Sequence, residues 1–370
     1  MESLKPPIGT AGAFQVVRPV PTPPDTSELY AALDLGTNSC RMLIARPQGN
    51  GFHVVDSFSK SVGLGIGLGK TGRLSGSSIE RTVHALRICR HKLNKHQVKH
   101  MRLVATEACR RAKNANVFID QARRDASLQL EIIQPQEEAR LAVVSCAPLV
   151  STRTEQLLVV DIGGGSTELV WIDISSVRRQ DRPRAIMRLH AGFHPPQSPF
   201  PAARVVDWIS VPLGMATLQD QFNDVEDDVA RFALMSCFFE EHLTEFTPYK
   251  DEQAREGVQI IGTSGTTTTI AASHLGLNRY ERAKVDGLRM TSDQIDKVIR
   301  SYLALGPNGR RHDPRLGQDR YQLIMSGSAI LQALLRCWPT GWLSVADRGL
   351  REGLLYDQMS TNGVLQGGPF

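Results

Sequence analysis

The sequence predicts an α/β protein made of two similar domains that face each other across a cleft. Short apolar stretches typical of buried strands alternate with segments of helical periodicity. Two stretches, residues 30–44 and 157–172, have the same form: an apolar strand with an aspartate near its end, a small polar turn and a second apolar strand. They lie about one domain's length apart. We therefore expect a duplicated domain that holds a phosphate-bearing ligand between its copies.

The second stretch has the more specific turn. Its turn residues are Gly163, Gly164, Gly165, Ser166 and Thr167. Three consecutive glycines remove every Cβ, so backbone N–H groups can converge on an anion, and the hydroxyls add donors. Asp161 and Glu168 flank the turn and would repel a bare phosphate, which indicates a bound divalent cation or an activated water. An ordinary glycine-rich hairpin is the alternative.

The first stretch repeats this pattern and weakens that alternative. Both copies contain the core Asp-x-Gly-x-x-Ser. The residues of the first copy that we expect to contact phosphate are Asp34, Gly36, Thr37, Asn38 and Ser39.

Two further glycine-rich segments differ in what they predict. Gly262, Ser264 and Gly265 follow an apolar strand and precede a helix at residues 267–275, and a helix N-terminus of this kind can bind an anion. Residues 63–70 read Gly-Leu-Gly-Ile-Gly-Leu-Gly-Lys, but their glycine spacing is not that of a P-loop. We expect this second segment to be a flexible connection.

Charged residues suggest three more features. Arg110, just after a strand at residues 101–105, could reach the cleft as a phosphate clamp. Glu137 and Glu138 open a helix, where acidic side chains also stabilise the helix dipole without any catalytic role. Residues 177–201 contain five arginines and five prolines and are expected to form a basic insertion or lid.

A helix with a buried stripe from Ile79 to Leu93 is expected to begin at a capping box formed by Ser77 and Glu80. Its basic residues form either a solvated face or a guide for a polyanion. They and the residues of the following turn are Arg87, Arg90, His91, Lys92, Lys95, His96, Lys99 and His100.

Composition excludes several classes of protein. The chain has 370 residues, of which 41% are hydrophobic and 22% are charged, which is typical of a globular protein of two domains. No apolar run approaches the roughly 20 residues that cross a bilayer. The six cysteines have neither CxxC nor metal-site spacing and indicate a reducing cytoplasm. The net charge of +5 suits a polyanionic ligand.

In this combination the motifs resemble those of the exopolyphosphatase/guanosine pentaphosphate phosphohydrolase family, which belongs to the actin, sugar-kinase and heat-shock-chaperone superfamily. The resemblance covers about residues 28–360. The matching stretches are residues 32–39, 106–114, 137–140, 161–168, 262–266 and 350–356. The resemblance implies two ribonuclease-H-like, or actin-like ATPase, domains with a cleft between them.

The expected organisation follows from that resemblance. A disordered proline-rich arm at residues 1–27 precedes domain I at 28–143. Domain II covers 144–345 and contains an insertion at 177–207. A C-terminal helix at 346–360 is expected to pack back on domain I, and the additional helical, HD-like region of longer relatives is expected to be absent.

The resemblance also implies roles for individual residues. Glu138, directly before Ala139, matches the catalytic base, and Arg110 matches a phosphate-contacting arginine. Asp161 and Glu168 match positions near a metal, expected to be Mg²⁺ with Mn²⁺ as a substitute. Gly63 stands where family members often have a basic residue, so one anchor is missing.

The resemblance implies a cytoplasmic, metal-dependent exopolyphosphatase that releases terminal phosphate from inorganic polyphosphate and favours short chains. It is expected to be a homodimer, with no membrane or specific nucleic-acid partner. Three alternatives stay open. One is hydrolysis of guanosine pentaphosphate (pppGpp), another is a phosphotransferase of the acetate- or sugar-kinase kind, and the third is a non-catalytic polyphosphate or nucleotide sensor.

Overall fold

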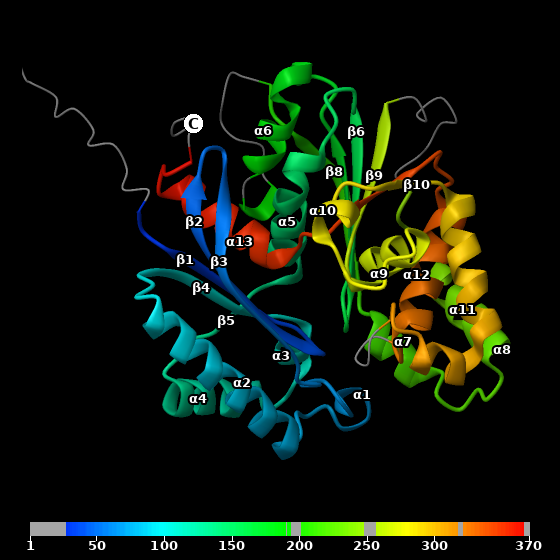
Figure 1. Cartoon of the computed structure of the whole chain (residues 1–370), viewed down its shortest axis with the longest axis horizontal. Helices are drawn as coiled ribbons and strands as arrows, with labels where there is room; N and C mark the ends of the chain where they lie inside the picture. Colours follow the sequence, from blue (N-terminus) through cyan, green and yellow to red (C-terminus); the bar gives the residue numbers. More distant parts are fainter. Residues whose placement is uncertain (1–26, 190, 194–200, 248–256, 317–320, 366–370) are drawn as a thin grey trace, which may run out of the picture.

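The computed structural model describes residues 27–189, 191–193, 201–247, 257–316 and 321–365. Most of the expected N-terminal arm, and residues 190 and 194–200 of the expected insertion, lie outside the described residues. Figure 1 shows two sheets with a layer of helices between them and further helices on each outer side. No helix in the described part of the chain is both long enough and apolar enough to span a membrane.

The first sheet has the strand order β3-β2-β1-β4-β5. Strands β1, β2 and β3 pair antiparallel, whereas β4 and β5 extend the sheet in parallel with β1. Their bounds are β1 (Tyr30–Leu35), β2 (Ser39–Gln48), β3 (Gly51–Ser61), β4 (His100–Ala105) and β5 (Glu131–Ile132).

The second sheet has the order β10-β11-β9-β6-β7-β8 and repeats this scheme. Strands β6, β7 and β8 pair antiparallel, and β9 and β11 continue in parallel with β6. Their bounds are β6 (Gln156–Ile162), β7 (Thr167–Asp173), β8 (Arg204–Val211), β9 (Val258–Thr263), β10 (Arg289–Met290) and β11 (Leu343–Ala346). The shared topology confirms the predicted fold of two similar α/β domains.

Strands β1 and β6 are apolar almost throughout because their side chains point alternately to two faces of the sheet, both of which are buried. In β1, Leu33 and Leu35 pack into an outer core, whereas Tyr30 and Ala32 face a core between the two sheets. Strand β6 divides in the same way, with Leu158 and Val160 outward and Leu157 and Val159 inward. A strand that is buried on both faces needs apolar residues at successive positions and not only at every second one.

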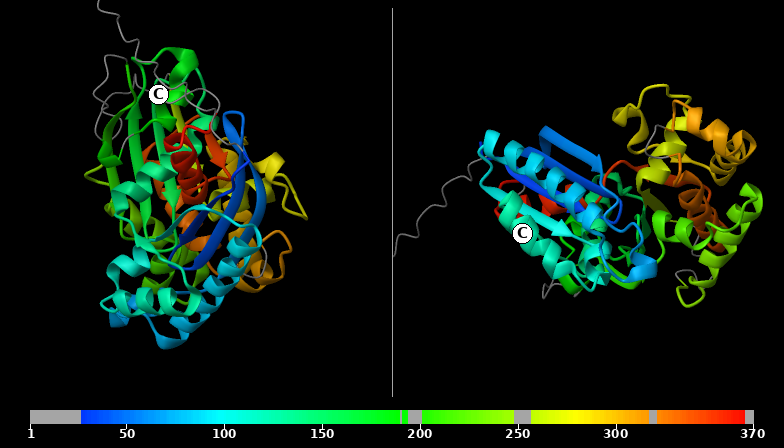
Figure 2. Two further views of the ribbon diagram at one scale, coloured as in Figure 1. Left: turned by 90° about the vertical axis from the view of Figure 1, so that its left-hand side faces the viewer. Right: turned by 90° about the horizontal axis from the view of Figure 1, so that it is seen from below.

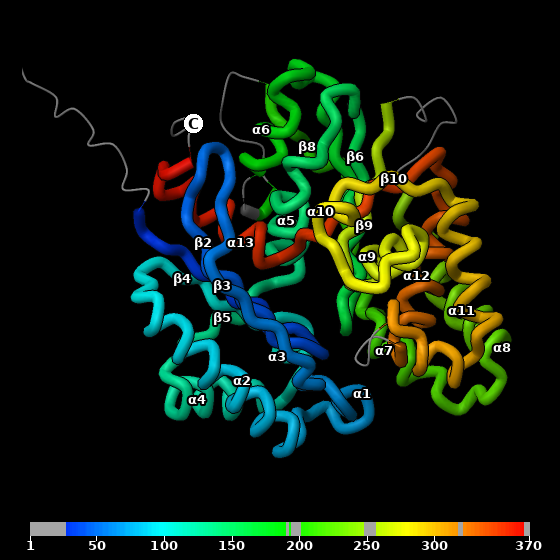
Figure 3. The backbone as a smooth tube through the Cα atoms, in the orientation of Figure 1, coloured from blue at the N-terminus to red at the C-terminus, as the bar shows by residue number. Residues whose placement is uncertain are grey.

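Helices fill three layers around these sheets, as Figures 2 and 3 also show. Helices α2 and α4 cover the outer face of the first sheet, and α8, α9, α11 and α12 cover that of the second. The helices of the first half are α1 (Leu68–Thr71), α2 (Gly76–Lys95), α3 (Glu107–Arg111), α4 (Ala115–Ala126) and α5 (Pro135–Cys146). Those that follow are α6 (Arg182–Met187), α7 (Met215–Gln221), α8 (Asp228–Glu241), α9 (Gly265–His274), α10 (Arg282–Val285), α11 (Ser292–His312), α12 (Ile324–Cys337) and α13 (Leu350–Thr361).

Helices α5 and α13 form the middle layer and pack against each other between the sheets. Helix α13 also packs on β1 and β2, whereas α5 packs on β6 and β7. Gly353 allows the close approach, because a Cβ there would collide with the backbone carbonyl of Leu141 on α5. The expected boundary at residues 143/144 falls inside α5, the helix that both sheets share.

Two local expectations about the chain are wrong. Helix α2 begins after Ser75, whose Oγ accepts from the N–H of Ser78 at 3.2 Å, and not at Ser77. Residues 63–70 are not a loose connection, because Gly63 N and Gly65 N donate to the carbonyls of Asn38 and Thr37, each at 2.9 Å.

The described part of the expected insertion is part of the folded core. Val177, Ile186 and Leu189 are at most 5% exposed, and α6 packs on α5. Arg182 can be buried without a large penalty because its guanidinium donates to the carbonyls of Val177 and Thr152. Residues 204–207, placed within the insertion from the sequence, form the first half of β8.

Candidate functional site

The two repeated turns have the same internal hydrogen bond. Gly36 N donates to Ser39 O and Gly163 N donates to Ser166 O, each at 2.9 Å. The turns meet across the cleft, since a Cβ on Gly164 would lie 3.5 Å from Asn38 N and one on Gly165 would strike Thr37 Oγ1. The glycines are therefore required by close approach as well as by turn geometry.

Strand alternation explains why Asp34 and Asp161 face each other. Each shares the parity of the inward-facing residues of its strand, Tyr30 and Ala32 in β1 and Leu157 and Val159 in β6. At the ends of these strands the inner core stops and a cleft begins, with a volume of about 260 Å³. Both carboxylates line it.

Most of the residues predicted from the sequence line this cleft together. From the three turns and α5 they are Asp34, Gly36, Thr37, Asn38, Ser39, Glu138, Asp161, Gly163, Gly164, Gly165, Ser166, Ser264 and Gly265. The remaining four lie behind its walls: Arg110, Thr167, Glu168 and Gly262. The Thr167 hydroxyl donates to the carbonyl of Leu213. Gly262 is required by close packing, because a Cβ there would lie 2.9 Å from the Thr267 side chain.

Glu138 at the N-terminal end of α5 is held by Arg110 of α3. Arg110 Nη1 donates to Glu138 Oε2 at 2.7 Å and to the carbonyl of Ile133 at 2.9 Å, while its Nη2 donates to Glu107 Oε2 at 2.9 Å. Burial, with repulsion from Glu168, raises the pKa of Glu138 well above its usual range, although Arg110 acts in the opposite direction. A carboxylate with a raised pKa is a stronger base, as proton abstraction near neutral pH requires.

The other acidic groups behave in the same way. Burial, together with repulsion from Glu138 and Asp34, raises the pKa of Asp161 to about 8. Burial also raises the pKa of Asp34, and Arg41 opposes that shift. Burial and the charge of Asp161 raise the pKa of Glu168 to about 7. These carboxylates are close enough to repel one another, which favours a cation among them.

The donor set fits Mg²⁺ in part. Mg²⁺ takes one or two carboxylates and keeps several waters, and Asp34 and Asp161 line the cleft on opposite walls. Glu168 fits less well, because it is 2% exposed and its Oε1 accepts from Ser210 at 2.9 Å. Within the described ranges, no three His, Cys, Asp or Glu side chains converge as a protein-only metal site.

The third turn caps its own helix. Ser264 Oγ accepts from the N–H groups of Thr266 and Thr267 at 3.1 and 3.2 Å. These two amides are therefore already satisfied. Thr263, Ser264, Gly265 and Thr268 line the cleft.

Three arginines of the cleft were missed in the sequence analysis: Arg41, Arg348 and Arg351. Arg41 is paired with Asp34 across the first hairpin, as Glu168 is paired with Asp161 across the second. Aligning the two repeats by hairpin register would have found it. Arg348 and Arg351 lie at the start of α13, and Arg348 Nη2 pairs with Asp286 at 2.8 Å. Only the folded chain brings that helix to the cleft.

Glu137 does more than complement the helix dipole, which corrects the expectation from its position. Its carboxylate accepts from Arg140 at 2.7 and 2.9 Å and from Arg102 of β4 at 3.0 Å. Both arginines also bind Asp357 of α13. Burial alone would raise the pKa of Glu137, but the two arginines lower it below its ordinary value. Glu137 therefore fixes α5 to its neighbours beside Glu138.

Comparison with known proteins assigns the chain to a family. The model of the Ppx/GppA phosphatase family matches residues 43–362. The chain belongs to this family. The resemblance inferred from the sequence motifs is thus confirmed.

Individual relatives agree with the family assignment. Guanosine-5'-triphosphate,3'-diphosphate pyrophosphatases of Aeromonas hydrophila and Aeromonas salmonicida are each 28% identical over 336 residues, which cover 91% of this chain. The chain spans 60% of the length of these curated relatives.

Solved structures agree as well. A Ppx/GppA family member from Aquifex aeolicus is 28% identical with a TM-score of 0.68, covering 90% of this chain and 97% of that one. An exopolyphosphatase from Cytophaga hutchinsonii, 22% identical with a TM-score of 0.74, covers 92% of this chain and 100% of its own and shares the fold.

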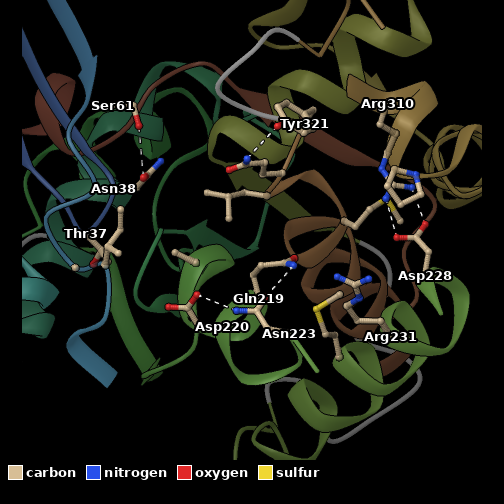
Figure 4. A pocket seen from close by; sticks show the side chains of 18 residues that line it. Thr37, Asn38, Ser61, Gln219, Asp220, Asn223, Asp228, Arg231, Arg310 and Tyr321 are labelled. Carbon is tan, nitrogen blue, oxygen red and sulfur yellow. Dashed lines mark hydrogen bonds and ion pairs between the residues drawn. The ribbon is translucent and has the colours of Figure 1, made fainter. Parts of the chain in front are cut away.

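Two larger cavities adjoin the cleft, and Thr37 lines all three. The first, of about 500 Å³, lies between the first turn and helices α7, α8, α11 and α12 (Figure 4). Its charged groups are largely balanced, since Arg310 forms two 2.7 Å hydrogen bonds with Asp228. The second, of about 530 Å³, lies between residues 65–70, α3 and α7.

Proposed function

We propose that this chain hydrolyses the terminal phosphate from inorganic polyphosphate. One observation carries the proposal: Glu138, a carboxylate with a raised pKa and only 13% of its side chain exposed, lines the same small cleft as both glycine turns. A base beside two anion-binding turns suits attack of water on a terminal phosphorus. The membership of a phosphatase family supports the same class of reaction.

Each step can be given to a group in the cleft. Glu138 accepts a proton from water as it attacks in line, and a base of this kind contributes about 10²–10⁴ in rate. The N–H groups of Gly164 and Gly165, with the hydroxyl of Thr37, hold phosphoryl oxygens. Thr37 Oγ1 is buried and has no partner in the described part of the chain, so it is available as a donor. Arg110, which does not line the cleft itself, positions Glu138 by donating to its Oε2.

Mg²⁺ would be held by Asp34 and Asp161, together with phosphate oxygens of the substrate, and would neutralise charge on the transferring group. The carboxylates of the cleft then no longer face a polyanion with uncompensated charge. The structure thus favours Asp34 over Glu168 as the second carboxylate in this proposal.

Chelation tests the metal. EDTA is expected to abolish phosphate release, and Mg²⁺ or Mn²⁺ should restore it. Asp161→Asn is expected to raise the Mg²⁺ concentration for half-maximal rate at least tenfold, whereas Glu168→Gln, which can still accept from Ser210, should change it less. Full activity after rigorous chelation would remove the metal from the mechanism.

The first adjoining cavity favours pppGpp hydrolysis as the second candidate. Its walls combine apolar groups such as Ile66 and Met235 with Arg231 and Arg310, and the Nε atoms of both arginines are buried without partners in the described part of the chain. A planar heterocycle fits such a mixed, charge-balanced cavity better than a polyanion does. Thr37 and Asn38 line both spaces, so one nucleotide could place its phosphates in the cleft and its nucleoside in the cavity.

Phosphate-release assays with polyphosphates of several lengths, pppGpp and ATP separate the candidates. A hydrolase releases phosphate without an acceptor, whereas a phosphotransferase needs one and a sensor binds without turnover. Absence of phosphate release from every polyphosphate length would overturn the main proposal.

The size of the cleft also predicts that very long chains have no advantage over shorter ones. Chains of hundreds of phosphates gain few contacts beyond those of chains of tens, so rates compared per chain end should not rise further with length. Trimming is expected to be distributive, which shortens a narrow-size polymer as one population on a gel. Full-length polymer persisting beside free phosphate would instead show processive action and contradict this prediction.

A further inference from the structure

The glycine-rich segment at residues 63–70 is part of the cleft architecture. Two of its amides are bound to carbonyls of the first phosphate turn. Gly63 and Gly67 have φ values of 55° and 76°, which favour glycine. A Cβ on Gly65 would strike the Thr37 side chain. The segment therefore fixes the backbone at Lys70, its last residue, relative to the turn.

The second adjoining cavity leads from the cleft to Lys70. Thr37, Glu107 and Gly165 line both spaces, so the cavity opens at the meeting point of the two phosphate turns. Lys70 and Arg111 line its outer part. A chain that leaves the cleft by this route would pass between α1 and α3, which lie near each other in Figure 1.

Two more basic residues continue the line beyond the cavity. Lys113 N donates to the carbonyl of Gly72 at 3.0 Å, which fixes the end of α3 beside α1. The Lys113 side chain runs along Gly72, with Cε 3.5 Å from the position of a Cβ there. Arg73 follows directly and is exposed. Lys70, Arg73, Arg111 and Lys113 together are called the α1–α3 basic surface below.

These four side chains keep most of their charge uncompensated. In the described part of the chain, Lys70, Arg73 and Lys113 have no ion pair, and Arg111 is 3.8 Å from Glu107, which binds Arg110 more closely. Two acidic residues line the same cavity: Glu107, which pairs with Arg110, and Asp220 on the opposite wall, which is hydrogen-bonded to Asn223. The excess of positive charge remains at the outer end.

The other basic region of this domain differs. Lys92 and His96 of α2 both bind Asp56, and Lys99 and His100 both bind Glu28. The charges of Lys92 and Lys99 are therefore paired within the domain, and Arg90 and Lys95 of this region line none of the three cavities. The first cavity offers a polyanion little as well, because Arg310 is neutralised by Asp228.

We propose that the α1–α3 basic surface binds the part of a polyphosphate chain that extends beyond the cleft, reached through the second cavity. This inference rests on the proposed function, since it assigns the path of that substrate. Binding strength should rise with chain length until the chain has passed Lys113 and should then level off, because further phosphates meet no more of this surface. The interaction should weaken with salt.

The test uses the variant Lys70→Glu/Lys113→Glu and the matched control Lys95→Glu/Arg124→Glu. The control reverses two exposed charges of the same domain on α2 and α4, outside all three cavities. Direct binding of labelled polyphosphate is measured alongside kcat/KM for tripolyphosphate and for chains of tens of phosphates.

We expect the first variant to bind chains of tens of phosphates on the order of tenfold more weakly and to lose kcat/KM more on these chains than on tripolyphosphate. The control should match the wild-type chain in both. Equal binding by the wild-type chain and the first variant would show that the α1–α3 basic surface does not bind polyphosphate, and it would not contradict the proposed hydrolysis. Binding that depends on Lys70 and Lys113 without any phosphate release would support the surface and overturn the hydrolase.

Discussion

Glu138→Gln is expected to lower turnover by about 10²-fold or more while substrate still binds. Glutamine keeps the size of the side chain and can still accept from Arg110, which donates to Glu138 Oε2 at 2.7 Å in the native protein. It cannot take a proton from water at the pH of the assay. Phosphate release under saturating substrate, with a parallel binding measurement, checks the result.

The control for this experiment has to be chosen from the structure. Glu137→Gln is unsuitable, because it breaks the ion pairs with Arg102 and Arg140 and is expected to lower stability. Glu80→Gln on the exposed face of α2 changes the same group without touching the cleft. Wild-type turnover in Glu138→Gln would exclude it as the base.

The repeated hairpins show how much of the fold could be predicted from the sequence. An aspartate near the end of an apolar strand, followed by a glycine turn, is a local pattern, and both copies form the hairpins that the sequence predicts. Helix α11 also had local signals, a capping box between Thr291 and Gln294 and an apolar stripe, which the sequence analysis overlooked. The short strands β10 and β11 gave little signal, because each depends on its neighbours in the sheet.

The candidate site was harder to predict where distant segments meet. Arg110 looked like a phosphate clamp, but its guanidinium is occupied by Glu107, Glu138 and a carbonyl. Asp357 lies far from Glu137 in the sequence, yet both bind the same two arginines. Contacts of this kind depend on the packing of α5 against α13, which no local pattern encodes. Residues 177–189 misled because Arg182, which looks solvated in the sequence, is buried and donates to the backbone carbonyls of Val177 and Thr152.

The same packing yields the second large prediction, Gly353→Ala. Alanine is the better helix former by about 1 kcal/mol, so propensity alone predicts stabilisation. The new Cβ would instead collide with the carbonyl of Leu141, a backbone atom that cannot rotate away. Overpacking of this kind costs about 1–3 kcal/mol, and here it acts on the two helices between the sheets. We expect a clear net loss in the free energy of unfolding, measured by urea titration.

Activity should fall with stability in Gly353→Ala, because Leu141 and Glu138 lie on the same helix and any shift of α5 moves the base relative to Arg110. Gly76→Ala is the matched control. Gly76 is the first residue of α2, has open space where a Cβ would be, and should tolerate alanine with unchanged or slightly higher stability. A Gly353→Ala protein as stable as the wild-type chain would show that α13 can move away from α5 without cost. In that case α5 would not be held by this crossing, and the position of Glu138 would depend on Arg110 and Glu137 alone.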